Sequence, residues 1–317
     1  MPKVSICIPC FNNPEDVDRL LWSIFEQEYT DYEVNISDDS TDERITELVD
    51  KYRILFVNKP INYVHNETPY GHIYNWNAAI KMASGEYIKI MFSDDWFTDK
   101  DSLGELVGLL DKNEDAVLAF SGSRQVMLDI DDTESVKHVT DEHNTQSYDR
   151  CASQEFIDGL KKDYRNLFLG NQIGAPSATL YRRGNELTLF DEESNWASDM
   201  FLYFDLLQKK SVFAYTEKPL ISIGVHAHQY TESFSDRDIR IYDDYRYMYT
   251  KYNLWESKAC RKYFLDKFII KYHKGLKEAK SLGISSFMYY MRWLREQKET
   301  VRCFIKSRMK KGSTDKK

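Results

Sequence analysis

Short apolar runs alternate with segments of helical periodicity through the first third of the chain. Strands are expected where the runs are nearly continuous or alternate in polarity, at residues 4–8, 32–38, 53–58, 86–92 and 116–121. Between them the apolar positions recur three and four residues apart, as they do on one face of a helix; one such helix is expected at residues 71–84. This order predicts an α/β fold with a mostly parallel sheet flanked by helices.

The pattern changes in the second half of the chain. Residues 124–150 are polar and acidic, and we expect an excursion or exposed hairpin there. The elements expected after it are a strand at residues 176–183, a helix at residues 197–209, short strands at residues 212–217 and 220–223, and a loop at residues 224–237. Two further helices are expected at residues 255–282 and 284–309, separated by Gly283. The pattern predicts a domain over residues 1–237 and a helical extension over residues 238–317.

Two short acidic motifs follow two of the expected strands. Residues 37–40 read Ser-Asp-Asp-Ser, and residues 93–95 read Ser-Asp-Asp. In open α/β sheets ligands bind beyond the carboxyl ends of the strands. Both aspartate pairs are therefore expected to converge on one binding crevice.

Charge is distributed unevenly along the chain. The net charge of the 317 residues is −8, but residues 251–317 hold 19 Lys and Arg against 6 Asp and Glu, or +13, which leaves −21 for residues 1–250. An acidic main part repels phosphate backbones, so no nucleic-acid partner is expected. The lack of a signal-peptide pattern and of a long apolar stretch favours a cytoplasmic protein.

The five cysteines do not suggest a disulfide framework. Their number is odd and their spacing wide, which is typical of a reducing compartment. Cys7 and Cys10 have C-x-x-C spacing, but they lie in an extended run and no second pair accompanies them. Buried strand cysteines are favoured over a redox or zinc site.

Three motifs in this order resemble the family 2 glycosyltransferases of GT-A fold. They are the run from Pro2 to Asn12, the acidic motif with Thr41 and Asp42 after it, and the strand from Gly85 that leads into residues 93–95. The resemblance covers residues 1 to about 230. It implies a GT-A type nucleotide-diphospho-sugar transferase fold with a nucleotide-binding half at about residues 1–122 and an acceptor half at about residues 151–237.

The resemblance implies a set of nucleotide-binding residues. Pro9, Phe11 and Asn12 match the turn that walls the uracil pocket, and Asp39 matches the residue that accepts a hydrogen bond from the nucleoside. Asp38 and Asp94 belong to the same expected set. The alternatives are a core aromatic for Phe11 and a helix-capping turn for the aspartates.

A metal site is implied by the second acidic motif. Asp94 and Asp95 resemble the family's metal motif, and His226 matches a histidine that reaches back to the metal; oxygen-rich sites of this kind suit Mn²⁺ or Mg²⁺. The chain departs from the family at three positions. Phe92 stands in place of the first aspartate, Trp76 in place of a frequent arginine, and Gly224 in place of a frequently basic residue.

Asp199 matches the general base of the inverting members. A carboxylate can take the proton from an acceptor hydroxyl as the new bond forms, and the alternative is an aspartate that caps a helix. An acceptor pocket is expected to include Gly174, Ala175, Pro176, Ser177 and Trp196.

The resemblance implies an inverting, metal-dependent glycosyltransferase of the hexosyl or N-acetylhexosaminyl class. Its donor would be a nucleotide sugar, most simply a UDP-sugar, and its acceptor a hydroxyl group, free or lipid-linked, in polysaccharide or glycolipid synthesis. The alternatives are a catalytically silent nucleotide-sugar-binding scaffold and a nucleotidyltransferase, although the chain lacks a glycine-rich triphosphate loop.

The C-terminal extension is basic and amphipathic. It is expected either to pack on its own domain or to bind an anionic membrane surface or a partner subunit, which would make the protein peripheral on the inner face of the cytoplasmic membrane.

Overall fold

The chain forms two compact units. The computed structural model describes residues 1–128, 146–226, 234–235 and 237–298. The units are Met1–Phe234 and Ser235–Lys317.

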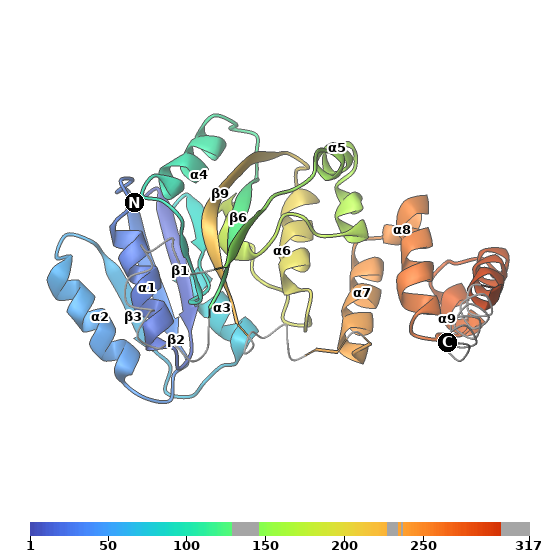
Figure 1. Ribbon diagram of the computed structural model, residues 1–317, viewed down its shortest axis with the longest axis horizontal. Coiled ribbons are helices and arrows are strands. Elements are labelled where there is room, and N and C mark those ends of the chain that lie inside the picture. The colour runs from blue at the N-terminus through green and yellow to red at the C-terminus, as the bar shows by residue number, and fades with distance from the viewer. Residues whose placement is uncertain (129–145, 227–233, 236, 299–317) are drawn as a thin grey trace, which may run out of the picture. The chain divides into compact units, whose positions relative to one another are not determined.

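A mixed β-sheet runs through the first unit, as Figure 1 shows. Within the described residues its strand order is β3-β2-β1-β4-β8-β6-β9-β5, and β7 pairs with β6 off this path. β1 pairs in parallel with β2 and β4, and β2 in parallel with β3, whereas β8 runs antiparallel to both β4 and β6. The strands are β1 (Val4–Cys10), β2 (Tyr32–Asp38), β3 (Ile61–His65), β4 (Tyr87–Ile90), β5 (Asp95–Phe97), β6 (Leu118–Met127), β7 (Ser147–Arg150), β8 (Thr179–Arg182) and β9 (Phe213–Val225).

Helices flank this sheet and share its core. The buried faces of α1, α2 and α4 contribute Val17, Ile45 and Leu103 to the same apolar cluster as Ile6 and neighbouring strand residues. The α-helices of this unit are α1 (Pro14–Phe25), α2 (Arg44–Leu55), α3 (His72–Lys81), α4 (Ser102–Asp111), α5 (Gln154–Lys162) and α6 (Ser198–Leu207). The predicted α/β class, with helices on the sheet, is confirmed.

The third strand lies later in the chain than predicted. The prediction of a strand at residues 53–58 is wrong, because α2 continues to Leu55 and the strand begins at Ile61. Tyr52 and Phe56 both stack on Phe25 of α1, with ring centroids 5.5 and 4.5 Å away, and this packing continues to the helix end. The β-branched and apolar residues that suggested a strand are instead exposed, Ile54 at 76% and Val57 at 80%.

The second half of the sheet also differs in detail. The two short strands predicted at residues 212–223 are one strand, β9, whose pairing with β6 contains a register shift next to Gly122. The short strand β5 was not predicted, and β8 is preceded by a 3₁₀ turn (η3, Pro176–Ala178). The predicted hairpin or excursion starts with β6 and ends with β7, which pair with each other, while residues 129–145 lie outside the described residues.

The second unit is helical, but its first predicted helix is interrupted. It contains α7 (Ile239–Lys251), a 3₁₀ turn (Leu254–Glu256), α8 (Lys258–Phe264), a π-helical turn (Leu265–Ile270) and α9 (Leu276–Ser281), and residues 286–298 are helical. The continuous helix predicted at residues 255–282 is wrong, because His273 adopts a left-handed conformation with φ of 53° between the π turn and α9. The remainder of the last predicted helix lies outside the described residues. None of the described helices meets the length and hydropathy required to cross a bilayer.

One buried amide fastens the segment before α6 to α3. The side chain of Asn77 is fully buried; its Nδ2 donates to the carbonyl oxygen of Phe190 at 3.0 Å, and its Oδ1 accepts from the Phe190 N–H at 2.8 Å. The same amide therefore satisfies both backbone groups of Phe190, which fixes the position of that ring.

Replacing this amide should destabilise the fold. Asn77→Ala leaves a buried N–H and a buried carbonyl without partners, so we expect a loss of about 2 kcal/mol in the free energy of unfolding. Urea denaturation followed by circular dichroism measures it. The control, Asn113→Ala at an exposed position, should change the free energy by less than about 0.5 kcal/mol; equal effects of the two substitutions would contradict the assignment.

Candidate active site

The carboxyl ends of β1, β2 and β4 meet at one edge of the sheet. In register, Cys10 at the end of β1 pairs with Asp38 at the end of β2, and Cys7 of β1 pairs with Ile90 of β4. Two side-chain contacts join the turns beyond these strands. The N–H of Asn12 donates to Ser40 Oγ at 2.8 Å, and Asn13 Nδ2 donates to Ser93 Oγ at 2.6 Å. The two acidic motifs are thus on the same edge, as the sequence predicted.

Asp38 and Asp39 occupy the first of these turns and have different surroundings. Asp38 is fully buried, and its oxygens accept from the Ser40 N–H and the Tyr63 hydroxyl, each at 2.8 Å. Asp39 is buried as well, and it accepts from Asn66 Nδ2 at 2.8 Å and from the Gly71 N–H at 2.9 Å. Asp38 therefore holds the turn together, and Asp39 connects it to the start of α3.

Phe11 and Asn12 form the exposed lip of this edge, while Pro9 is buried in β1. The Phe11 side chain is 54% exposed, which excludes the alternative of a core aromatic. Asn12 adopts a left-handed conformation with φ of 54°, which asparagine tolerates better than most residues. Its Oδ1 accepts from the Thr41 N–H at 2.9 Å, so it crosses from the β1 turn to the β2 turn.

Asp94 and His226 come together from distant parts of the sequence. Asp94 Oδ2 lies 3.4 Å from His226 Nε2, and both side chains are about a quarter exposed. The hydrogen bond to Asp94 raises the pKa of His226. Gly224 permits this approach, because its N–H donates to the Asp94 carbonyl at 3.2 Å and a Cβ there would lie 2.5 Å from that oxygen.

A second charged pair from α1 lies beside Asp94 and His226. Arg19 Nη2 donates to Asp16 Oδ1 at 2.6 Å, and burial raises the pKa of Asp16, which also interacts with both Asp94 and His226. The guanidinium is almost fully buried over Trp96, 4.4 Å from the ring centroid, and its Nε and Nη1 have no hydrogen-bond partner among the described residues. This pair was not predicted, because its only signal in the sequence is an acid and a base three residues apart on a helix.

The residues at this edge fit a divalent cation bound together with a phosphate ligand. A carboxylate oxygen and an imidazole nitrogen are suitable donors for Mn²⁺ or Mg²⁺. Among the described residues there is no group of three or more His, Cys, Asp and Glu placed to hold a metal ion by themselves. Any cation at Asp94 and His226 would therefore need oxygens from its ligand to complete its coordination.

Asp95 lies below the surface in a buried polar network. Its carboxylate is hydrogen-bonded to Ser177 and the Gly224 N–H, and burial raises its pKa. Lys89 is also fully buried; its ammonium donates to the carbonyl oxygens of Ser177 and Ile90, and burial lowers its pKa to about 7. This network, which the sequence analysis missed, fixes the acidic turn against η3.

The segment expected to form the acceptor pocket is only partly accessible. Pro176 and Ser177 are buried, Gly174 and Ala175 are half-buried, and Gly174 has a φ of 96° with open space where a Cβ would be. Asp199 is the second residue of α6, and Trp196 is half-buried just before it. Asp199 accepts from Asn171 Nδ2 at 2.6 Å and from the Met200 N–H at 2.7 Å.

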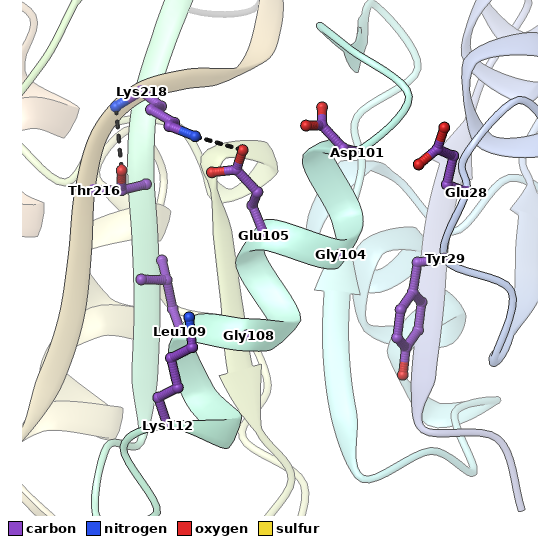
Figure 2. Close-up of a pocket in the computed structure, with 10 residues that line it drawn as sticks. All are labelled: Glu28, Tyr29, Asp101, Gly104, Glu105, Gly108, Leu109, Lys112, Thr216 and Lys218. Carbon is purple, nitrogen blue, oxygen red and sulfur yellow. Dashed lines mark hydrogen bonds and ion pairs between the residues drawn. The ribbon is translucent and has the colours of Figure 1, made fainter.

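The described residues also form an open groove, which lies elsewhere. It has a volume of about 660 Å³ and is lined by residues of α4, β9 and the α1–β2 connection, as Figure 2 shows. Its polar rim includes the Lys218–Glu105 ion pair. None of the candidate site residues lines it, so we do not assign it to the site.

The GT-A fold is the class that this sheet and edge define. Staphylococcus aureus TarS (residues 1–349, in complex with UDP-GlcNAc) has a TM-score of 0.59 at 18% identity, over 90% of this chain and 78% of that one. The mannosyltransferase PcManGT from Pyrobaculum calidifontis, in complex with GDP-Man and Mn²⁺, has a TM-score of 0.54 at 17% identity, over 79% and 64%. At these identities the likeness shows the fold alone.

The chain belongs to glycosyl transferase family 2, which it matches over residues 5–187. It is 38% identical over 117 residues to the abequosyltransferase RfbV of Salmonella typhimurium, covering 36% of this chain and 34% of that protein. It is 29% identical over 120 residues to the poly(ribitol-phosphate) β-N-acetylglucosaminyltransferase TarS of S. aureus, covering 37% and 20%. The matched segments thus span 34% and 20% of these relatives.

A side chain at position 224 should displace the acidic turn. In Gly224→Ala the new Cβ meets the Asp94 carbonyl, and we expect a loss of about 1–3 kcal/mol in the free energy of unfolding. Thermal denaturation measures it. Gly108→Ala is the matched control, since a Cβ there has nothing within 4 Å in the middle of α4, and it should stabilise the protein slightly. A Gly224→Ala protein as stable as the wild type would contradict the close approach.

Proposed function

We propose that this protein is an inverting, metal-dependent glycosyltransferase that moves a sugar from a UDP-sugar to a hydroxyl acceptor in polysaccharide or glycolipid synthesis. The observation that carries the proposal is the meeting of the β1, β2 and β4 ends, which places Asp39 on the same edge as the Asp94–His226 pair. Family membership supports the transfer chemistry. The complexes of TarS with UDP-GlcNAc and of PcManGT with GDP-Man and Mn²⁺ support a nucleotide-sugar donor.

In this proposal the nucleoside lies at the β1–β2 edge. Phe11 offers an exposed ring for stacking on uracil, which is worth about 1 kcal/mol beyond its buried area. Asn12 and Asp39 supply polar groups beside it, and Asp38 and Pro9 support them from below. The diphosphate then lies beside Asp94.

Asp94 and His226 would hold the cation, and Asp95 would support the turn from below or join them. When bound, Mn²⁺ or Mg²⁺ supplies Lewis acidity that stabilises the departing diphosphate. Asp94 and His226 would be oriented by contacts with Asp16, Arg19 and the Gly224 N–H. Asp199 takes the proton of the acceptor hydroxyl while that oxygen bonds to the anomeric carbon and the bond from this carbon to the diphosphate breaks.

The C-terminal unit is proposed to bind an anionic membrane surface or a partner subunit. The last described helix exposes Phe287, Tyr290, Met291 and Leu294, three and four residues apart, and each is at least 43% exposed. Basic residues are abundant in the same part of the chain. Apolar residues beside cations suit the interface of an anionic bilayer. Replacing these four residues with polar ones should change either vesicle binding or the elution volume in size-exclusion chromatography. If neither changes, both forms of the proposal are contradicted.

A catalytically silent nucleotide-sugar-binding protein is the second candidate. The observation that favours it is the presence of Phe92 and Trp76 at positions that are polar in the family; their rings lie 4.8 Å apart, and Phe92 is two residues before Asp94. Incubation with UDP-sugars and Mn²⁺ separates the candidates, because slow donor hydrolysis releases UDP from a transferase and not from a binding protein.

Loss of the Asp94 carboxylate should remove the metal dependence of nucleotide binding. In Asp94→Asn we expect UDP affinity in the presence of Mn²⁺ to fall about 100-fold, to the value measured with EDTA, because the cation no longer bridges protein and diphosphate. Isothermal titration calorimetry measures it, with Glu114→Gln as the control for loss of one remote carboxylate. Unchanged Mn²⁺-dependent affinity would refute the site.

Loss of the Asp199 carboxylate should affect transfer and leave donor binding intact. In Asp199→Asn we expect kcat to fall by about 10²–10⁴ with an unchanged Kd for UDP, because the amide cannot accept the acceptor's proton. Asp205→Asn, on the same helix, is the control and should retain wild-type kcat. A fully active Asp199→Asn enzyme would place the base elsewhere.

A further inference from the structure

Three aromatic rings pack together beside the acidic turn, and we call Trp76, Phe92 and Phe190 the aromatic cluster. The Trp76 ring lies 4.8 Å from that of Phe92 and 4.9 Å from that of Phe190, and the two phenylalanine rings are 6.5 Å apart. Phe190 is 2% exposed, whereas Trp76 and Phe92 are only half-buried. The cluster therefore has a buried base and keeps part of two rings accessible.

Polar contacts from η3 and α3 hold the backbone of two members of the cluster. The Phe92 N–H donates to Ser177 Oγ at 3.0 Å, and both backbone groups of Phe190 are bonded to Asn77 of α3. Trp76 precedes Asn77 in the same helix. The backbone of both phenylalanines is thus tied to neighbouring elements, and the three rings pack on one another.

The position of the cluster connects it to the donor sugar. Phe92 is two residues before Asp94, where the diphosphate is proposed to lie, and its N–H donates to the Ser177 hydroxyl, which is also hydrogen-bonded to the Asp95 carboxylate. In an inverting transfer the anomeric carbon must lie between the leaving diphosphate and the base. A sugar ring attached to a diphosphate at Asp94 would therefore have Phe92 and the rings packed on it as neighbours.

The chemistry of the cluster differs from what a fully hydroxylated sugar requires. Acidic or basic side chains at positions 92 and 76 could hydrogen-bond sugar hydroxyls. The three rings offer only the indole N–H of Trp76. A hydroxyl pressed against them would lose its water without gaining a partner, whereas a CH₂ or CH₃ group would gain apolar contact.

The geometry points to a nucleotide donor whose sugar lacks a hydroxyl on the edge that faces the aromatic cluster, that is, a deoxyhexose. This inference rests on the proposed function and adds the substrate class to it. One missing oxygen in an apolar site changes affinity by about 10- to 100-fold. The methyl group of an acetamido substituent could also contact the aromatic cluster, so the experiment includes UDP-GlcNAc.

The test compares donors that differ by single groups. Binding of UDP-glucose, its 3-, 4- and 6-deoxy analogues and UDP-GlcNAc is measured by calorimetry with Mn²⁺, with UDP alone as the reference. We expect at least one deoxy analogue to bind about tenfold or more tighter than UDP-glucose. Deoxy analogues that bind no tighter than UDP-glucose, or a gain confined to UDP-GlcNAc, would overturn the inference. Absence of UDP binding would instead refute the proposed function.

A substitution in the cluster gives an independent result. Phe92→Asp restores an acceptor beside the sugar and should reduce the deoxy preference at least tenfold without changing UDP affinity. Phe92→Asn serves the same purpose if the charged variant fails to fold, as judged by thermal denaturation. Tyr74→Ala, an exposed tyrosine of the same α3, is the matched control and should keep the wild-type ratio. An unchanged ratio in the folded Phe92 variant would contradict the inference.

Discussion

The parallel pairing of β1 with β2 on one side and with β4 on the other is the constraint on which the candidate site depends. Because side chains and chain ends follow the strand register, this pairing alone decides that the two acidic motifs end at the same edge. The contacts of Asn12 with Ser40 and of Asn13 with Ser93 then lock the three turns to one another. A shift of either strand would separate the aspartates whatever their local conformation.

Burial divides the acidic residues into two groups. Asp38, Asp39 and Asp95 are enclosed, and their oxygens accept hydrogen bonds from hydroxyl, amide and backbone N–H groups, so they stabilise the turns. Asp94 remains partly open beside His226. Burial of the Asp95 carboxylate and of the Lys89 ammonium costs desolvation for both charges. Stability alone therefore does not explain why Lys89 and Asp95 are buried. Their hydrogen bonds do, however, fix the backbone that carries Asp94.

The sequence was most informative where one local signal decides the structure. Apolar runs ending in Ser-Asp-Asp were sufficient to place β2, β4 and the site edge, and the exposure of Phe11 agrees with its place on the lip. Side-chain packing between distant residues decided the rest. The stacking of Tyr52 and Phe56 on Phe25 extends α2 through a strand-like run, and Gly224 is required only because the Asp94 carbonyl approaches it. The Asp16–Arg19 pair and the Asn77–Phe190 tie have no motif, since their partners become neighbours only in the folded chain.

The central claim is that Asp94 and His226 hold a cation that bridges to a nucleotide diphosphate at the β1–β2–β4 edge. Anomalous diffraction from crystals soaked with UDP and Mn²⁺ tests it most directly, because manganese identifies itself by its own scattering. The account predicts one manganese peak within coordination distance of the Asp94 carboxylate and His226 Nε2, with the uracil beside Phe11 and Asp39. A peak at other residues, or bound UDP far from this edge, would contradict it.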